Sequence, residues 1–122
     1  MADPPLSDDQ RSALREAMEA ERSFTAGRLA ALDRTFDEMV AAADLEPPDD
    51  EHDPEGTTAY ERAQVSSLAR EARSRLADLD RALAGVDDPA FGACERCGRP
   101  IGWERLRARP GTARCVGCAD AP

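Results

Sequence analysis

The segment Phe91–Ala119, FGACERCGRPIGWERLRARPGTARCVGCA, contains all four cysteines of the chain. They form two Cys-x-x-Cys pairs with seventeen residues between the pairs, 98 to 114. This spacing is typical of a zinc site, in which four thiolates surround one ion at roughly 2.3 Å. The pattern therefore predicts one structural Zn²⁺ ion, ligated by Cys94, Cys97, Cys115 and Cys118.

Two other readings of the cysteines are a pair of disulfides and a redox-active Cys-x-x-Cys. No signal peptide precedes the finger, so an oxidising compartment has no support. No βαβ pattern surrounds either pair, which argues against a thioredoxin-like site. His52 is the single histidine and has no cysteine nearby. Four sulfurs would fill the zinc shell and leave no position for substrate, so the expected ion is structural and not catalytic.

The composition indicates a helical chain without a broad globular core. Of the 122 residues, 41% are hydrophobic, much of that alanine, and only 4% are aromatic. Alanine, arginine, glutamate and leucine are good helix formers, so we expect an all-α fold. No apolar run reaches the ~20 residues that span a bilayer. The chain is expected to be soluble and cytoplasmic, with no membrane partner.

Charge is unevenly distributed along the chain. Residues 1–90 carry ten arginines and 22 acidic residues, a formal charge of −12. Residues 91–122 carry six arginines and three acidic residues, a formal charge of +3. An acidic balance argues against nonspecific binding of duplex DNA, which requires cations to neutralise phosphates. It favours a partner with a positively charged surface or channel.

The first ninety residues contain two helical seams. After a flexible tail over 1–6, Ser7 and Gln10 have the spacing of a capping box, and a helix is expected to run to about Ala43. Apolar positions then recur every three or four residues. This seam consists of Leu14, Met18, Thr25, Leu29, Leu32, Phe36, Met39 and Ala43.

The segment 44–56, DLEPPDDEHDPEG, interrupts the helical pattern with three prolines and seven acidic residues. A second helix is expected to begin at a cap on Thr57 or Thr58. Its seam repeats every 3.5 residues, the coiled-coil period, and consists of Val65, Leu68, Ala72, Leu76, Leu79, Leu83 and Val86.

The two seams predict a long antiparallel coiled-coil hairpin over 7–90, with an acidic tip loop at 44–56, followed by a small C4 zinc finger at 91–122. The alternative is that each seam pairs with another molecule. Because a two-helix hairpin has a thin core, a structural zinc site worth about 10–16 kcal/mol can supply the missing stability. Phe91, Ile101, Trp103 and Leu106 are the expected apolar contacts between finger and hairpin, and for Trp103 packing is preferred over ligand binding.

The finger resembles that of the DksA/TraR family of RNA polymerase-binding regulators. The matching residues stand in the family's order and spacing: Gly92, Cys94, Cys97, Gly98, Ile101, Gly102, Arg105, Leu106, Ala108, Arg109, Pro110, Cys115 and Cys118. The resemblance implies a helical hairpin that enters the secondary channel of RNA polymerase and modulates initiation without binding promoter DNA.

The same resemblance assigns a role to the acidic segment. The family's hairpin tip often reads Asp-x-x-Asp-x-Ala, and Asp50 and Asp53 supply the two acids here, with Glu55 in place of the alanine. These three residues are the implied partner-binding residues. Some members also bind the alarmone ppGpp, and Arg109 matches one basic position of that site. Asp78 and Ala119 stand where those members have lysine, so the resemblance implies no shared alarmone site.

Three other functions compete with transcription regulation. A zinc-stabilised coiled-coil adaptor for a different protein would use the same fold. A nucleic-acid-binding zinc ribbon would use the six finger arginines, although no aromatic residues are interleaved with them. An enzyme is the least favoured, because the sequence has neither a phosphate loop nor a Ser/His/Asp set.

Overall fold

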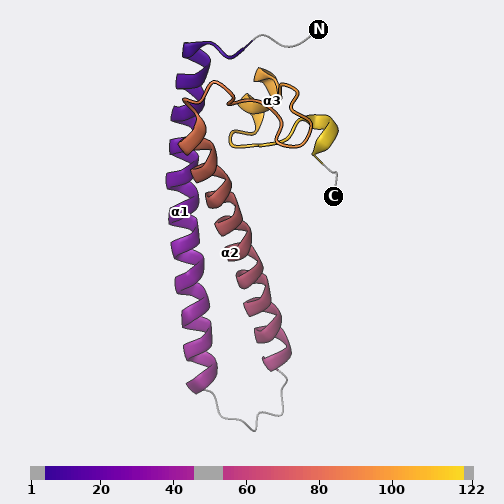
Figure 1. The fold of residues 1–122 in the computed structure, drawn as a ribbon. Coiled ribbons are helices and arrows are strands. Elements are labelled where there is room, and N and C mark those ends of the chain that lie inside the picture. Colours follow the sequence, from indigo (N-terminus) through magenta and orange to yellow (C-terminus); the bar gives the residue numbers. More distant parts are fainter. Residues whose placement is uncertain (1–4, 46–53, 120–122) are drawn as a thin grey trace. The chain divides into compact units, whose positions relative to one another are not determined.

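Helices dominate the part of the chain that the computed structural model describes, residues 5–45 and 54–119 (Figure 1). Two long helices come first, α1 (Asp8–Leu45) and α2 (Pro54–Gly85). The finger contains the short helix α3 (Trp103–Ala108) and a 3₁₀ turn at Val116–Cys118. No strand occurs in either described range, where the one β feature is an isolated bridge between Ala93 and Pro100. The expected all-α class is confirmed.

The N-terminus of α1 has the expected capping box. The Ser7 backbone N–H donates to Gln10 Oε1 at 2.9 Å, and the Gln10 N–H donates to Ser7 Oγ at 3.1 Å. These reciprocal bonds satisfy two N–H groups that a helix start leaves without intrahelical partners. At its other end α1 runs to Leu45, slightly beyond the expected Ala43.

The second helix begins earlier than its threonines suggest. The expected cap at Thr57 or Thr58 is wrong, because α2 starts at Pro54. Proline has no N–H to lose at the first helical position, and its fixed φ suits a helix start. The helices therefore include both ends of the segment 44–56 that was expected to be a loop.

The chain divides into two compact units, each containing part of both long helices. One unit comprises residues 1–23 and 76–122. In it, the ion pair Arg22–Asp80 joins α1 to α2, and the ion pair Arg15–Asp87 joins α1 to the turn just past the end of α2. Residue numbers rise along one helix as they fall along the other, so the two segments are antiparallel. Each pair is substantially exposed and adds little stability, so the buried side chains hold this unit together.

The other unit comprises residues 24–75. Asp33 and Arg73 form an ion pair at 2.8 Å across its helices, and the described residues buried between them are small: Thr25, Ala69 and Ala72. Larger seam residues such as Leu32 and Leu68 are only half-buried. Two helices alone cover one side of each large side chain, which leaves the other side in water. The predicted antiparallel hairpin is confirmed, and its core in this unit is thin.

Candidate metal centre

The first cysteine pair lies on a tight turn closed by backbone hydrogen bonds. The Gly98 N–H donates to the Cys94 carbonyl at 2.9 Å, and the Cys94 N–H donates to the Arg99 carbonyl at 2.8 Å. Gly98 has φ of 76°, a left-handed conformation that side chains resist. Glycine at this position allows the chain to reverse so that Cys94 and Cys97 present their sulfurs to the same point.

The second pair lies on the 3₁₀ turn, where the Cys118 N–H donates to the Cys115 carbonyl at 3.0 Å. A backbone bond from the Glu95 N–H to the Ala113 carbonyl, 2.8 Å long, connects the two turns. Arg105 of α3 supports the connecting loop, because its Nε donates to the Arg114 carbonyl at 2.8 Å. Hydrogen bonds outside the sulfurs therefore also hold the two cysteine pairs together.

All four Sγ atoms lie within 4.8 Å of one another, and all four thiols are free. The Cys97 and Cys115 sulfurs are 3.7 Å apart. Tetrahedral coordination with bonds of roughly 2.3 Å places two sulfurs roughly 3.8 Å apart, so this distance fits a shared Zn²⁺ ion. The predicted grouping of Cys94, Cys97, Cys115 and Cys118 is therefore present, with a thiolate donor set that suits zinc and leaves no open position.

The pKa values of two of the thiols are shifted in opposite directions. Hydrogen bonds from the backbone of Cys115 and Cys97 lower the pKa of Cys94 to about 6. A side-chain hydrogen bond with Cys115, together with desolvation, raises the pKa of Cys118 to about 12. Cys94 is therefore a ready thiolate at neutral pH, whereas Cys118 must lose a proton when a metal ion binds.

The finger shares a hydrophobic core with the two long helices. Cys94, Ile101 and Leu106 are buried in one cluster, to which α1 contributes Leu14 and Met18, α2 contributes Leu79, and the turn after α2 contributes Val86. Phe91 and Trp103 are half-buried and pack against the same cluster. The four expected finger contacts are thus confirmed, and Trp103 serves packing as expected.

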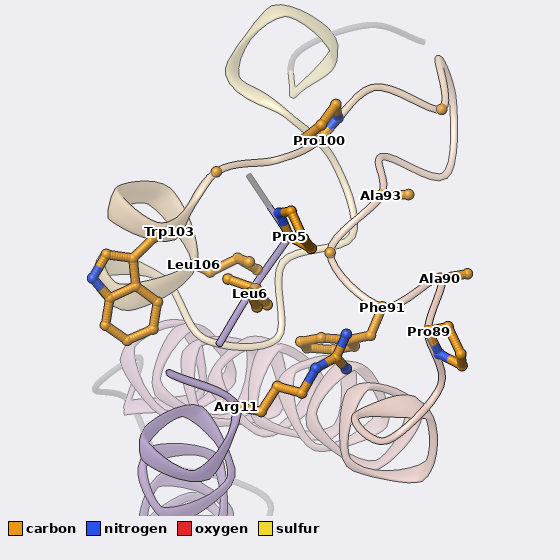
Figure 2. Close-up of a pocket in the computed structure, with 13 residues that line it drawn as sticks. Pro5, Leu6, Arg11, Pro89, Ala90, Phe91, Ala93, Pro100, Trp103 and Leu106 are labelled. Carbon is orange, nitrogen blue, oxygen red and sulfur yellow. The ribbon is translucent and has the colours of Figure 1, made fainter. Parts of the chain in front are cut away.

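Arg11 joins three elements in a way that the sequence did not predict. Its Nη1 donates to the Val86 carbonyl at 2.6 Å and to the Asp88 carbonyl at 3.1 Å, just past the end of α2. Its guanidinium also lies 5.9 Å from the centroid of the Phe91 ring (Figure 2). The Asp88 carbonyl also accepts the Phe91 N–H at 2.9 Å, so Arg11 ties α1 to the hydrogen-bonded turn that follows α2. The only sequence cue is a basic residue one turn into a capped helix, which is not specific.

The segment before α1 also differs from the flexible tail expected over 1–6. Residues 1–4 lie outside the described part, but Leu6 packs against the core. Leu6 lies 3.5 Å from where a Cβ on Gly92 would stand, and Gly92 has φ of 97°. Leu6 and Pro5 border a cavity of about 260 Å³ together with Phe91 and Leu106 (Figure 2). Leu6 is therefore part of the core of this unit.

The expected partner-binding acids lie mostly beyond what the structure describes. Asp50 and Asp53 fall outside the described residues, and Glu55 falls in the first turn of α2. Among the positions compared with the alarmone site, Arg109 and Ala119 are exposed. Asp78 forms an ion pair with Arg81 of its own helix, so its charge is already matched within the chain.

A protein-family comparison matches residues 89–121 to the prokaryotic dksA/traR C4-type zinc finger. The RNA polymerase-binding transcription factor DksA of Escherichia coli K12 is 37% identical over 68 residues, which cover 54% of this chain and 45% of DksA. DksA of Caulobacter vibrioides is 47% identical over 38 residues, covering 31% of this chain and 27% of the relative. An uncharacterised Aquifex aeolicus protein is 34% identical over 65 residues, covering 53% and 45%. This chain thus spans less than half the length of each of these relatives.

Among solved structures, transcription factor DksA2 from Pseudomonas aeruginosa is similar over 92% of this chain and 81% of its own, with a TM-score of 0.71. Sequence identity is 23%, so this likeness shows a shared fold. The finger match and the cluster of four thiols together show that the protein carries one structural zinc ion. No helix among the described residues is long and apolar enough to cross a membrane.

Proposed function

Because this chain belongs to the prokaryotic DksA/TraR C4-type zinc-finger family, we propose that it is a transcription regulator that binds RNA polymerase through the secondary channel. In this proposal the helical hairpin enters the channel, and the acidic residues between its helices modulate initiation. The chain acts in the cytoplasm, catalyses no reaction and makes no sequence-specific contact with DNA.

One observation carries the proposal: the finger and the helices share a single core. Cys94 is 3% exposed and lies in the same cluster as Met18 of α1 and Leu79 of α2, both 0% exposed. A metal ion bound at this point stabilises the ends of both helices as well as the finger itself. Such an arrangement favours a finger that is fixed to the ends of the helices over a finger that is joined to them by a flexible linker.

The zinc ligands in this proposal are Cys94, Cys97, Cys115 and Cys118. The separation of their sulfurs supports this assignment. Purified protein should contain one zinc ion per chain, and Cys97→Ser should lose most of it. Arg96→Ser beside it is the matched control and should keep one equivalent. Full zinc occupancy in Cys97→Ser would contradict the ligand assignment.

Charge supports the choice of partner. The first 90 residues carry a formal charge of −12, and seven of their acids lie in the segment 44–56. This negative charge attracts a partner with a positively charged channel. The same charge lowers the affinity of this chain for nucleic acid. We propose that Asp50, Asp53 and Glu55 contact the polymerase near its catalytic centre, where carboxylates can interact with Mg²⁺ or its ligands.

A reconstituted initiation assay tests the proposal. The protein should co-purify with RNA polymerase and change the yield or lifetime of open complexes. The double variant Asp50→Asn/Asp53→Asn should still bind polymerase but lose this effect. Asp37→Asn/Glu38→Gln removes the same charge from exposed positions on α1 and should regulate normally. Equal regulation by both double variants would refute the role of Asp50 and Asp53.

The binding arm of the same experiment separates the proposal from an adaptor function. An adaptor for another protein would use the same zinc-stabilised hairpin but would not retain polymerase subunits. Absence of polymerase binding by the zinc-loaded protein, at concentrations where DksA binds, would refute the proposed partner.

A further inference from the structure

Two main-chain carbonyls just before Cys115 are bonded to different parts of the finger. The Ala113 carbonyl accepts the Glu95 N–H at 2.8 Å. The Arg114 carbonyl accepts the Nε–H of Arg105, also at 2.8 Å. Glu95 belongs to the turn that carries the first cysteine pair, and Arg105 belongs to α3. The segment that leads into the second cysteine pair is therefore held both to the first pair and to α3.

Arg105 also makes a second, longer contact with this segment. Its Nη2 lies 3.5 Å from Thr112 Oγ1, and the same hydroxyl donates to the Arg114 carbonyl at 3.3 Å. The Arg105 side chain is half-buried. A guanidinium holds its N–H donors in a rigid, planar fork. Because both contacts come from one fork, they fix residues 112 and 114 relative to α3.

The helix that carries Arg105 is itself fixed to the core. Leu106 is 1% exposed and lies in the core cluster of this unit, against which Trp103 also packs. Cys94 of the first pair is buried in the same cluster, whereas both cysteines of the second pair are only half-buried. Packing alone thus fixes the second pair less firmly than Cys94, and Arg105 connects the second pair to a helix that is firmly packed.

We propose that Arg105 is a positioning residue for the zinc site, which directs the second cysteine pair toward the first. Residues that orient metal ligands through hydrogen bonds commonly change metal affinity ten- to hundredfold. Here the bond goes to the main chain beside a ligand and not to the ligand itself, so we expect the lower end of that range. The inference concerns the zinc site alone and does not rest on the proposed transcription function.

Charge alone is the competing explanation for an effect of Arg105 on zinc binding. Four thiolates around one Zn²⁺ ion carry a net negative charge, which any nearby cation favours. The substitution Arg105→Lys separates the two explanations. Lysine keeps the positive charge but has a methylene group where arginine has Nε, so it loses the bond to the Arg114 carbonyl. Positioning therefore predicts that lysine fails to replace Arg105, whereas charge alone predicts that lysine succeeds.

Zinc affinity, measured on the full chain by competition with a chelator of known affinity, tests the proposal. Arg105→Gln should weaken zinc binding about tenfold, and Arg105→Lys should weaken it nearly as much. Arg107→Gln is the matched control, because it removes an arginine from the same helix. Arg107 is exposed and forms an ion pair with Glu104 of α3, so its loss should leave zinc affinity unchanged.

The absorption spectrum of the cobalt-loaded protein reports the arrangement of the thiolates, which a loss of stability alone would not change. The bands of bound Co²⁺ depend on the type and geometry of its ligands. At saturating Co²⁺, these bands should be shifted or weakened in Arg105→Gln and Arg105→Lys, whereas the spectrum of Arg107→Gln should coincide with that of the wild type. Far-UV circular dichroism should be the same in all four proteins, because the long helices and Leu106 are unchanged.

Three results would each overturn the proposal. The first is equal zinc affinity in Arg105→Gln and Arg107→Gln. The second is wild-type zinc affinity in Arg105→Lys, which would assign the effect to charge. The third is a wild-type cobalt spectrum in both Arg105 variants, because the thiolates would then be arranged without help from Arg105. None of these results bears on polymerase binding, so the two proposals fail separately.

Discussion

Replacement of Arg11 by methionine tests how the helices are joined to the finger. The guanidinium makes two hydrogen bonds to main-chain carbonyls, at 2.6 and 3.1 Å, and approaches the Phe91 ring. Hydrogen bonds of a charged group contribute about 1.5–3 kcal/mol each when buried, and an exposed cation–π contact about 0.5–1 kcal/mol. The lower ends of these ranges sum to about 3.5 kcal/mol. Because Arg11 is only half-buried, we take roughly half of that sum and expect a loss of about 2 kcal/mol.

The assay is urea unfolding of the zinc-loaded protein, followed by Trp103 fluorescence. With a urea dependence of about 2 kcal/mol per molar, the loss corresponds to a midpoint about 1 M lower. Arg70→Met, at an exposed arginine of α2, is the control and should shift the midpoint by no more than ~0.2 M. Arg11→Lys should recover part of the loss, because a single ammonium cannot reproduce the fork of a guanidinium. Equal midpoints for Arg11→Met and Arg70→Met would show that the Arg11 hydrogen bonds do not stabilise the fold.

Three further predictions concern the core and the metal site. Leu79→Ala, at a position that is 0% exposed, should destabilise the zinc-loaded protein by about 3 kcal/mol in the same urea assay. Gly98→Ala should weaken zinc binding in a chelator competition by about tenfold, because a left-handed φ costs other residues about 1–2 kcal/mol, whereas Gly27→Ala should leave zinc affinity unchanged. Calorimetry at pH 8 in buffers of different ionisation enthalpy should detect at least one proton released per zinc ion bound. Cys118, with a pKa raised to about 12, still holds its proton at that pH, while Cys94, lowered to about 6, does not. Zinc affinity should accordingly fall as pH is lowered, and binding without proton release would contradict this account of the thiols.

The metal site and the helical hairpin were predictable because each depends on a short, periodic pattern. Two Cys-x-x-Cys turns orient their sulfurs locally, and the grouping of all four follows from the single loop between them. The capping box at Ser7 is likewise a contact across three residues. The antiparallel arrangement followed from two apolar seams with an interruption between them, since neither seam can stay in water.

The features that the sequence did not predict depend on contacts between distant residues or on competing local signals. Arg11 bonds to carbonyls 75 and 77 residues away, and no pattern specifies which arginine does so. Pro54 and Thr58 are both credible helix starts, and only the folded chain selects the proline. Leu6 looked like part of a tail because its partner, Gly92, lies in the finger. Leu32 and Leu79 are both seam leucines in the sequence pattern. Leu32 is only half-buried whereas Leu79 is fully buried, because burial also depends on which other parts of the chain cover each side chain.

A crosslinking measurement with RNA polymerase tests whether the segment between α1 and α2 enters the secondary channel. A photo-reactive residue at position 53 of the zinc-loaded protein should form crosslinks to the polymerase subunits that line the secondary channel. The same probe at position 99, on the exposed surface of the finger, should not reach the catalytic centre. Crosslinks from position 53 that include no polymerase subunit, or that map to the outer surface of the enzyme, would show that the hairpin does not enter the secondary channel.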